Sequence, residues 1–229
     1  MDKKTDIFNF TSEYETRDPD QMPEIPPCFQ HINRYWDTKN NSFAAKLKPG
    51  EFYVSNSGEL ITTILGSCVA ACIRDTRIGI GGMNHIMLPN ADKYSKWKAT
   101  PVSLKTRYGN IAMESLINFI LSNGGKRENL EIKLFGGAAM FNFVEDVGKK
   151  NIEFVKMYLI REGLNISNED VGGRRPRKIH YYPVSGRVRV KQIASMHNQT
   201  LYEREREFLT TVTKKTLTGN IELFEESGD

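Results

Sequence analysis

Four short apolar runs between residues 52 and 88 constrain the fold of this chain more than any other feature. Residues 52–54 and 60–65 are rich in aromatic and β-branched side chains, residues 69–73 alternate, and residues 78–88 form a run interrupted by glycines. Turn-forming residues separate the runs, so each is predicted to be a β-strand. Glycines inside a strand indicate a bulge or a close approach of another backbone, which we expect in the fourth run.

Two helices are predicted in the second half of the chain. Apolar residues three and four positions apart predict a helix over residues 109–123, with a pair of glycines at its end. Asn151 is predicted to cap the second helix, and Gly163 to end it. The polar segment 90–107 has no periodicity, so it is predicted to be a surface loop bordering any site near residue 85.

Further strands complete the pattern of an α+β protein. Residues 130–135 alternate as a strand, and residues 179–182 and 188–193 are predicted to form a hairpin around a Ser185-Gly186 turn. Strands that cluster early, two separated helices and a late hairpin favour mixed or mainly antiparallel β-sheet layers flanked by helices. They disfavour a doubly wound parallel sheet.

The two ends of the chain differ from its middle. Residues 1–45 contain four prolines among polar and aromatic residues, so they are predicted to be an extension that is loosely ordered or laid over the domain. Residues 46–194 are predicted to form a single domain, because 229 residues suffice for one full core. Residues 195–229 are predicted to form an amphipathic helical tail that packs on the domain or on a partner.

Composition excludes several classes of protein. No run approaches the roughly 20 consecutive apolar residues of a membrane helix, and the polar N-terminus lacks the apolar centre of a secretory signal. A cytoplasmic location without membrane insertion is therefore expected. The net charge is only +4, and the basic cluster 174–178 lacks interleaved aromatic residues, so nucleic-acid binding is not expected.

A cysteine and a histidine stand next to neighbouring predicted strands. Cys68 follows Gly66 and Ser67, which permit a sharp turn and leave little steric cover over the sulfur, and His85 lies 85 − 68 = 17 positions later. A thiol attacks a carbonyl as the thiolate, and a neighbouring imidazole produces the thiolate by accepting the proton. Cys68 and His85 are thus candidates for nucleophile and base, with the N–H groups of Gly66 and Ser67 as candidate oxyanion donors.

Two other interpretations fit the same residues. Cys68 is also compatible with a small core residue and His85 with a buried imidazole, because free cysteine is among the most buried residue types. A zinc site of Cys68, Cys72 and His85 lacks the second pair of ligands that structural zinc normally has, since His180 stands alone. Cys72 has no adjacent glycine and is predicted to lie in the core.

A catalytic imidazole also needs a partner on its second nitrogen, which fixes its tautomer. No Asp or Glu lies in the strands nearest Cys68, but Thr62 and Thr63 do. Since successive side chains of a strand point to opposite faces, only one of the two threonines would face the site.

Four motifs make this chain resemble the CheD family, the chemoreceptor glutamine deamidases of bacterial and archaeal chemotaxis. The match runs from about Gly50 to Ile193. The resemblance implies that Cys68 is the nucleophile, that His85 is the general base, and that Thr62 orients His85. It also implies an α+β fold shared with bacterial toxin deamidases. The motifs are Leu65-Gly66-Ser67-Cys68, the segment 82–89, the segment 133–138 and Asp170-Val171-Gly172-Gly173.

The resemblance further implies a substrate and partners. The substrate would be a glutamine side chain on the cytoplasmic helices of a methyl-accepting chemotaxis receptor, converted to glutamate with release of ammonia and without metal or cofactor. The same machinery would cleave a glutamyl methyl ester, and a CheC-type phosphatase is the family's usual partner. The alternative is a non-catalytic adaptor that binds CheC or receptors.

Several more residues are candidates for contacts with the substrate. Glycines in the later motifs would let the backbone approach a substrate helix closely, or would simply form tight turns. Two arginines would pair with acidic residues of the receptor, or would lie in a solvated loop. The glycines are Gly136, Gly137, Gly172 and Gly173, and the arginines are Arg174 and Arg177.

Overall fold

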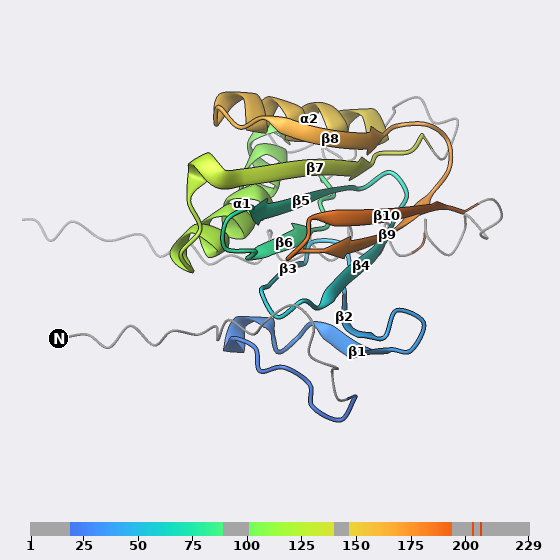
Figure 1. Ribbon diagram of the computed structural model, residues 1–229. Coiled ribbons are helices and arrows are strands. Elements are labelled where there is room, and N and C mark those ends of the chain that lie inside the picture. Colours follow the sequence, from blue (N-terminus) through green and yellow to red (C-terminus); the bar gives the residue numbers. More distant parts are fainter. Residues whose placement is uncertain (1–18, 89–100, 140–146, 194–202, 204–206, 208–229) are drawn as a thin grey trace, which may run out of the picture.

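Two five-stranded sheets form the framework of the described part of the chain (Figure 1). The structure, a computed structural model, describes residues 19–88, 101–139 and 147–193, with Glu203 and Glu207. The first sheet has the order β1 (Asn33–Asp37), β2 (Ser42–Lys46), β4 (Leu60–Leu65), β9 (Arg177–Tyr182), β10 (Arg187–Gln192). The second has the order β3 (Phe52–Ser55), β6 (Gly81–Asn84), β5 (Val69–Asp75), β7 (Leu130–Gly136), β8 (Ile166–Val171).

Antiparallel pairing dominates both sheets, as the sequence predicts. Among the strands in the described ranges, only β2 with β4 and β7 with β8 pair in parallel. The predicted strands in residues 52–54, 60–65, 69–73 and 130–135 are confirmed, and so is the terminal hairpin. The mixed, mainly antiparallel α+β class is therefore confirmed.

Two helices pack on the second sheet. The helix α1 (Pro101–Ser122) contacts β3, β5 and β6, and α2 (Val147–Arg161) contacts β5 (Figure 1). The helices bury apolar residues spaced three or four positions apart, which is the pattern of a core-facing stripe. These residues are Met113, Leu116, Ile117 and Ile120 in α1, and Val155, Tyr158 and Leu159 in α2.

Both helices begin earlier than their sequence patterns indicate. Residues 101–107 are helical, so the prediction of a loop over 90–107 is wrong for that part, and residues 89–100 lie outside the described residues. The start at Pro101 is favourable because proline lacks the N–H that a first helical turn leaves unpaired. The helix α2 starts at Val147, so Asn151 lies inside the helix and the prediction that it caps the helix is wrong.

The N-terminal segment is part of the domain. Phe29 and Ile32 lie in the core, a short 3₁₀ helix η1 (Pro27–Phe29) precedes β1, and β2 pairs with β4. Residues 33–46 are thus neither loosely ordered nor merely laid over the domain, because β1 and β2 are strands of its first sheet. The few aromatic side chains of this segment anchor a sequence whose overall composition is polar. Residues 1–18 lie outside the described residues.

The predicted fourth strand is shorter than its apolar run. Residues 81–84 form β6, and beyond it Ile86 makes an isolated bridge with Val69. A Cβ atom on Gly82 would collide with the Tyr53 carbonyl, which confirms the expected close approach of a second backbone.

The strand β8 lacks an apolar run in the sequence, and it was not predicted. Of the predicted C-terminal helix only Glu203 and Glu207 are described, and both are helical and exposed. None of the helices in the described part of the chain has the length and apolar character that crossing a membrane requires.

Candidate active site

Cys68 lies in the turn that leads from one sheet to the other. The turn joins β4 to β5, and two backbone hydrogen bonds connect it to the residues that follow β7. Gly137 N–H donates to the Cys68 carbonyl at 2.7 Å, and Ala138 N–H donates to the Gly66 carbonyl at 2.8 Å. Cys68 is 0% exposed, so the expectation of a sulfur with little steric cover is wrong. The small residues Gly66 and Ser67 allow neighbouring segments to pack closely on the turn, which buries the sulfur rather than exposing it to solvent.

The strand register places Cys68 and His85 on one face. Val69 and Ile86 exchange two backbone hydrogen bonds, of 3.0 and 2.7 Å. One position further along this register, Cys68 faces Met87, and His85 faces Ala70. Since side chains alternate between faces along a strand, this register predicts that Cys68 and His85 are diagonal neighbours on the same face, a relationship in which Cα atoms are about 7–8 Å apart.

Thr63 fixes the protonation pattern of His85. The Thr63 hydroxyl lies 3.0 Å from the Leu47 carbonyl and 2.8 Å from His85 Nδ1. Because its single hydrogen is donated to the carbonyl, the hydroxyl accepts from Nδ1–H of the imidazole. In the neutral ring this leaves Nε2 as the unprotonated nitrogen, which is the form that a general base requires.

Burial keeps the imidazole neutral. His85 is 3% exposed, and burial lowers the pKa of His85 to about 3. Its Nε2 atom has no hydrogen-bond partner among the described residues. A buried nitrogen with an unused lone pair is unfavourable for stability, and such groups are typical of functional sites.

Thr62 does not contact His85. Its hydroxyl donates to the Ile179 carbonyl at 2.8 Å, and its neighbour Thr63 occupies the face toward the imidazole. The prediction that Thr62 orients the histidine is therefore corrected to Thr63. Spacing along the sequence does not settle the choice, because the two threonines are adjacent and the turn after β4 separates both of them from Cys68.

The glycine motifs bring the protein's own backbone segments together. A Cβ atom on Gly136, whose φ is +107°, would collide with the Cys68 carbonyl. Gly172 N–H donates to the Gly136 carbonyl at 2.8 Å, and Ala139 N–H donates to the Gly173 carbonyl at 2.8 Å. The N–H groups of Gly137 and Gly172 are thus already used inside the protein, which supports the tight-turn interpretation for these two residues.

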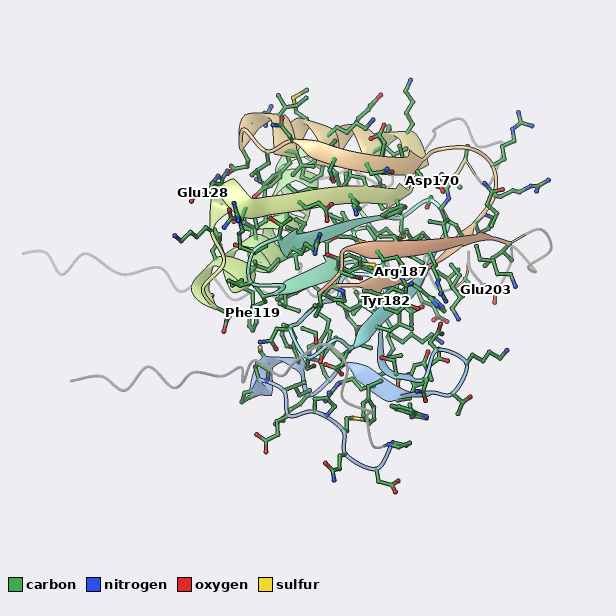
Figure 2. All side chains as sticks on the ribbon, viewed as in Figure 1. Phe119, Glu128, Asp170, Tyr182, Arg187 and Glu203 are labelled. Atoms are coloured by element: carbon green, nitrogen blue, oxygen red, sulfur yellow. The ribbon has the colours of Figure 1, made fainter. Side chains whose placement is uncertain are left out.

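Arg177 joins the two glycine motifs from inside. It is 3% exposed and donates to the carbonyls of Gly136, at 2.7 Å, and Gly172, at 2.8 Å. Asp170, labelled in Figure 2, lies 3.3 Å from the Arg177 guanidinium. Both sequence interpretations of Arg177, a receptor contact and a solvated loop residue, are wrong, because it occupies an inward position of β9.

The basic cluster at 174–178 is therefore not a continuous surface patch. Arg174 and Arg175 are exposed, while Pro176 and Arg177 are buried. An arginine at an inward position of an alternating strand is the signal that could have identified the structural role of Arg177. A receptor contact by Arg174 stays a prediction.

The other cysteines lie away from this chemistry. Cys72 is buried in β5, as predicted, and burial raises the pKa of its thiol well above the ordinary value. Cys28 is exposed, and none of the three cysteines, all of which the structure describes, is in a disulfide. No group of three or more His, Cys, Asp or Glu side chains comes together in the ranges that the structure describes, so the zinc interpretation gains no support there.

One residue of the site was missed by sequence reasoning. The side-chain amide of Asn151 donates to the Ser67 carbonyl at 2.8 Å and accepts from Leu88 N–H at 3.1 Å. Asn151 thereby connects the turn before Cys68 with the segment after His85. Its position at the start of a helical pattern suggested a cap instead.

Comparison with known proteins gives a consistent result. The sequence model of the family described as CheD chemotactic sensory transduction matches residues 87–192. A protein of Halorhodospira halophila named probable chemoreceptor glutamine deamidase CheD is 50% identical over 204 residues, which cover 89% of this chain and 94% of the relative. Relatives of the same name from Hahella chejuensis and Herminiimonas arsenicoxydans are 46% and 45% identical, over 90% and 84% of this chain and 97% and 94% of their own lengths.

Proposed function

The chain belongs to the CheD family, and we propose that it is a chemoreceptor glutamine deamidase, which hydrolyses a receptor glutamine side chain to glutamate and ammonia. Similarity to relatives of that name along nearly their whole length supports the activity. The observation that supports the chemistry is the buried His85, whose Nδ1 lies 2.8 Å from the Thr63 hydroxyl and whose Nε2 has no hydrogen-bond partner among the described residues.

The first half of the reaction releases ammonia. His85 Nε2 accepts the proton of the Cys68 thiol while the sulfur attacks the carboxamide carbon, forming a C–S bond and an oxyanion. Backbone N–H groups around Cys68, from residues such as Gly66 and Ser67, stabilise that oxyanion. The imidazolium then protonates the leaving nitrogen, the C–N bond breaks, and a thioester remains on Cys68.

The second half regenerates the enzyme. Neutral His85 accepts a proton from water, and the resulting hydroxide attacks the thioester carbon. The C–S bond breaks, the sulfur takes the proton from the imidazolium, and the product is glutamate. Since a methyl ester presents the same carbonyl, hydrolysis of glutamyl methyl esters is expected as a weaker activity.

Burial determines how the proton moves in this site. The environment that lowers the pKa of His85 to about 3 disfavours a resting thiolate–imidazolium ion pair. We expect the imidazolium to form only together with the oxyanion, whose negative charge stabilises it. Because Cys68 is fully buried, a glutamine side chain also has to displace the groups that cover the sulfur before it reacts.

Thr63 acts as a positioning residue in this mechanism. By accepting from Nδ1–H it keeps the proton off Nε2 in the resting enzyme, and it stabilises the ring orientation during both proton transfers. A hydroxyl stabilises an imidazolium less than a carboxylate does, which agrees with a site that holds its histidine neutral.

The proposed partners follow from the substrate. The chain acts in the cytoplasm on the cytoplasmic helices of a methyl-accepting chemotaxis receptor, with exposed Arg174 as a candidate contact to acidic receptor residues. A CheC-type phosphatase is a proposed regulator. The residues outside the described ranges at both ends are candidates for the contacts with these partners.

A matched pair of cysteine variants tests the proposal. Cys68→Ala is expected to abolish ammonia release from a purified receptor fragment, whereas Cys72→Ala, which truncates a buried cysteine four positions away (72 − 68), keeps the activity. Circular dichroism checks that both variants are folded. Activity of Cys68→Ala contradicts the mechanism, and receptor binding without ammonia release by the wild type favours a non-catalytic adaptor.

A further inference from the structure

Asn151 occupies a position where the sheet would otherwise pair its own backbone. In an antiparallel ladder, pairs that exchange two hydrogen bonds recur every second residue. Val69 and Ile86 are such a pair, so the next one in the same register is Ser67 with Leu88, since 67 + 88 equals 69 + 86. Their direct bond would run from the Leu88 N–H to the Ser67 carbonyl.

The side chain of Asn151 replaces that bond. Its Oδ1 accepts from Leu88 N–H at 3.1 Å, and its Nδ2 donates to the Ser67 carbonyl at 2.8 Å. The amide thus stands between the two segments with the same donor and acceptor groups as a peptide unit. It satisfies both backbone groups while holding the segments further apart than a direct bond would.

Cys68 lies between this inserted amide and the Val69–Ile86 bridge. On one side its neighbour Val69 is fixed to the segment that carries His85, and on the other side its neighbour Ser67 is fixed through Asn151. The separation of the two segments at Cys68 therefore depends on the inserted amide. That separation sets how the sulfur sits relative to the imidazole.

The amide itself is rigidly placed. Asn151 is 0% exposed and lies in the second turn of α2. Gly148, in the first turn, packs directly on the backbone of Gly137, whose N–H is donated to the Cys68 carbonyl. The start of α2 is thus connected to Cys68 in two ways, through the Asn151 amide bonded to Ser67 and through Gly148 packed on Gly137.

We infer that Asn151 is a positioning residue for the thiol chemistry, which sets Cys68 against His85 without contacting the substrate. The inference rests on the proposed deamidase function. A residue in this role affects the chemical step and the acid–base behaviour of the thiol, and it leaves binding of the receptor unchanged.

Two substitutions of Asn151 distinguish the effect of losing hydrogen bonds from the effect of adding a negative charge. Asn151→Asp keeps the acceptor for Leu88 N–H but removes the donor to Ser67, and Asn151→Leu keeps the approximate shape but removes both bonds. Val155→Ala is the matched control, because Val155 lies one turn later on the same helix, is equally buried, and has an apolar side chain that hydrogen-bonds neither backbone group. It lowers stability without altering the ladder.

The experiment measures kcat and KM for ammonia release by the full-length protein, and the pH dependence of Cys68 alkylation by iodoacetamide. Both Asn151 variants are expected to lower kcat by about tenfold or more with KM within about twofold. The midpoint pH of alkylation is expected to change in both, because the surroundings that set the ionisation of the thiol change when the sulfur moves. Val155→Ala keeps the wild-type kcat and midpoint.

Two results overturn the inference. One is a wild-type kcat and alkylation midpoint in both Asn151 variants, and the other is an equal loss of kcat in Val155→Ala, which indicates a merely structural role. If the wild type releases no ammonia, the deamidase proposal itself fails. The alkylation midpoints then still decide the role of Asn151, because they need no receptor.

Discussion

Exchanging either of two adjacent threonines for valine distinguishes the two candidate partners of His85. Thr62→Val and Thr63→Val are nearly isosteric, both residues are buried in β4, and each change removes a single hydroxyl. Only the Thr63 hydroxyl lies next to the imidazole, so only Thr63→Val is expected to impair the chemistry.

The size of the effect follows from the groups left without partners. In Thr63→Val, both His85 Nδ1–H and the Leu47 carbonyl lose a buried partner. Each such loss costs about 1–3 kcal/mol, so the free energy of unfolding is expected to fall by roughly 2–6 kcal/mol. Loss of the orienting bond in the transition state corresponds to a fall in kcat of roughly 5- to 150-fold.

Thr62→Val removes only the bond to the Ile179 carbonyl, so its cost in stability is about 1–2 kcal/mol and its kcat stays within about threefold of wild type. Ammonia release gives kcat, urea unfolding gives the stability, and ¹⁵N NMR of the His85 ring shows which nitrogen carries the proton. A larger fall in kcat for Thr62→Val than for Thr63→Val refutes the assignment.

Three further perturbations test the electrostatics and packing. Because burial lowers the pKa of His85, the unfolded state binds a proton at this residue below the ordinary pKa of 6.5, whereas the folded state does not. The contribution of His85 to stability is therefore complete above pH 6.5, and it falls by about 1.4 kcal/mol per pH unit as the pH drops toward 3. Urea unfolding of His85→Gln between about pH 7 and pH 5 should show a weaker dependence of stability on pH than the wild type, and an equal dependence contradicts this. Glu59→Gln breaks a buried ion pair with Arg34 at 2.6 Å and is expected to cost about 3–5 kcal/mol in urea unfolding, whereas a loss below about 1 kcal/mol shows that the pair is solvated. Gly136→Ala forces a Cβ atom against the Cys68 carbonyl at a φ of +107°, so it should lower the melting temperature and cost at least about 2 kcal/mol; an unchanged melting temperature contradicts the tight approach.

The elements with strong apolar patterns could be predicted from the sequence. The strands β3, β4, β5 and β7 and the β9–β10 hairpin all have alternating or continuous apolar runs, and all appear within a few residues of their predicted bounds. The strand β8 could not be predicted, because it lies at the edge of its sheet and its residues Ser167–Asp170 are polar.

The chemistry of the site was predictable as residue types, and its contacts were not. Cys68 and His85 follow from a thiol and an imidazole near neighbouring strands, since their pairing is local in sequence. The choice of Thr63 over Thr62 depends on the face that β4 presents, and one residue of register reverses it.

Long-range contacts explain the remaining differences. Arg177 binds the Gly136 carbonyl and Asn151 binds the Ser67 carbonyl, across sequence separations of 41 and 84 residues. Nothing in the local pattern around either residue indicates these partners. Both side chains satisfy backbone groups of loops that carry the family motifs, so these partners become visible only when the loops are placed together.

Mass spectrometry of a receptor fragment incubated with the protein tests whether Cys68 deamidates a receptor glutamine. We expect a gain of about one dalton at a single glutamine, with wild type and Cys72→Ala alike, and no gain with Cys68→Ala, because the sulfur of Cys68 forms the thioester that water converts to glutamate. An unchanged glutamine mass with the wild type, or the same gain with Cys68→Ala, refutes catalysis by Cys68.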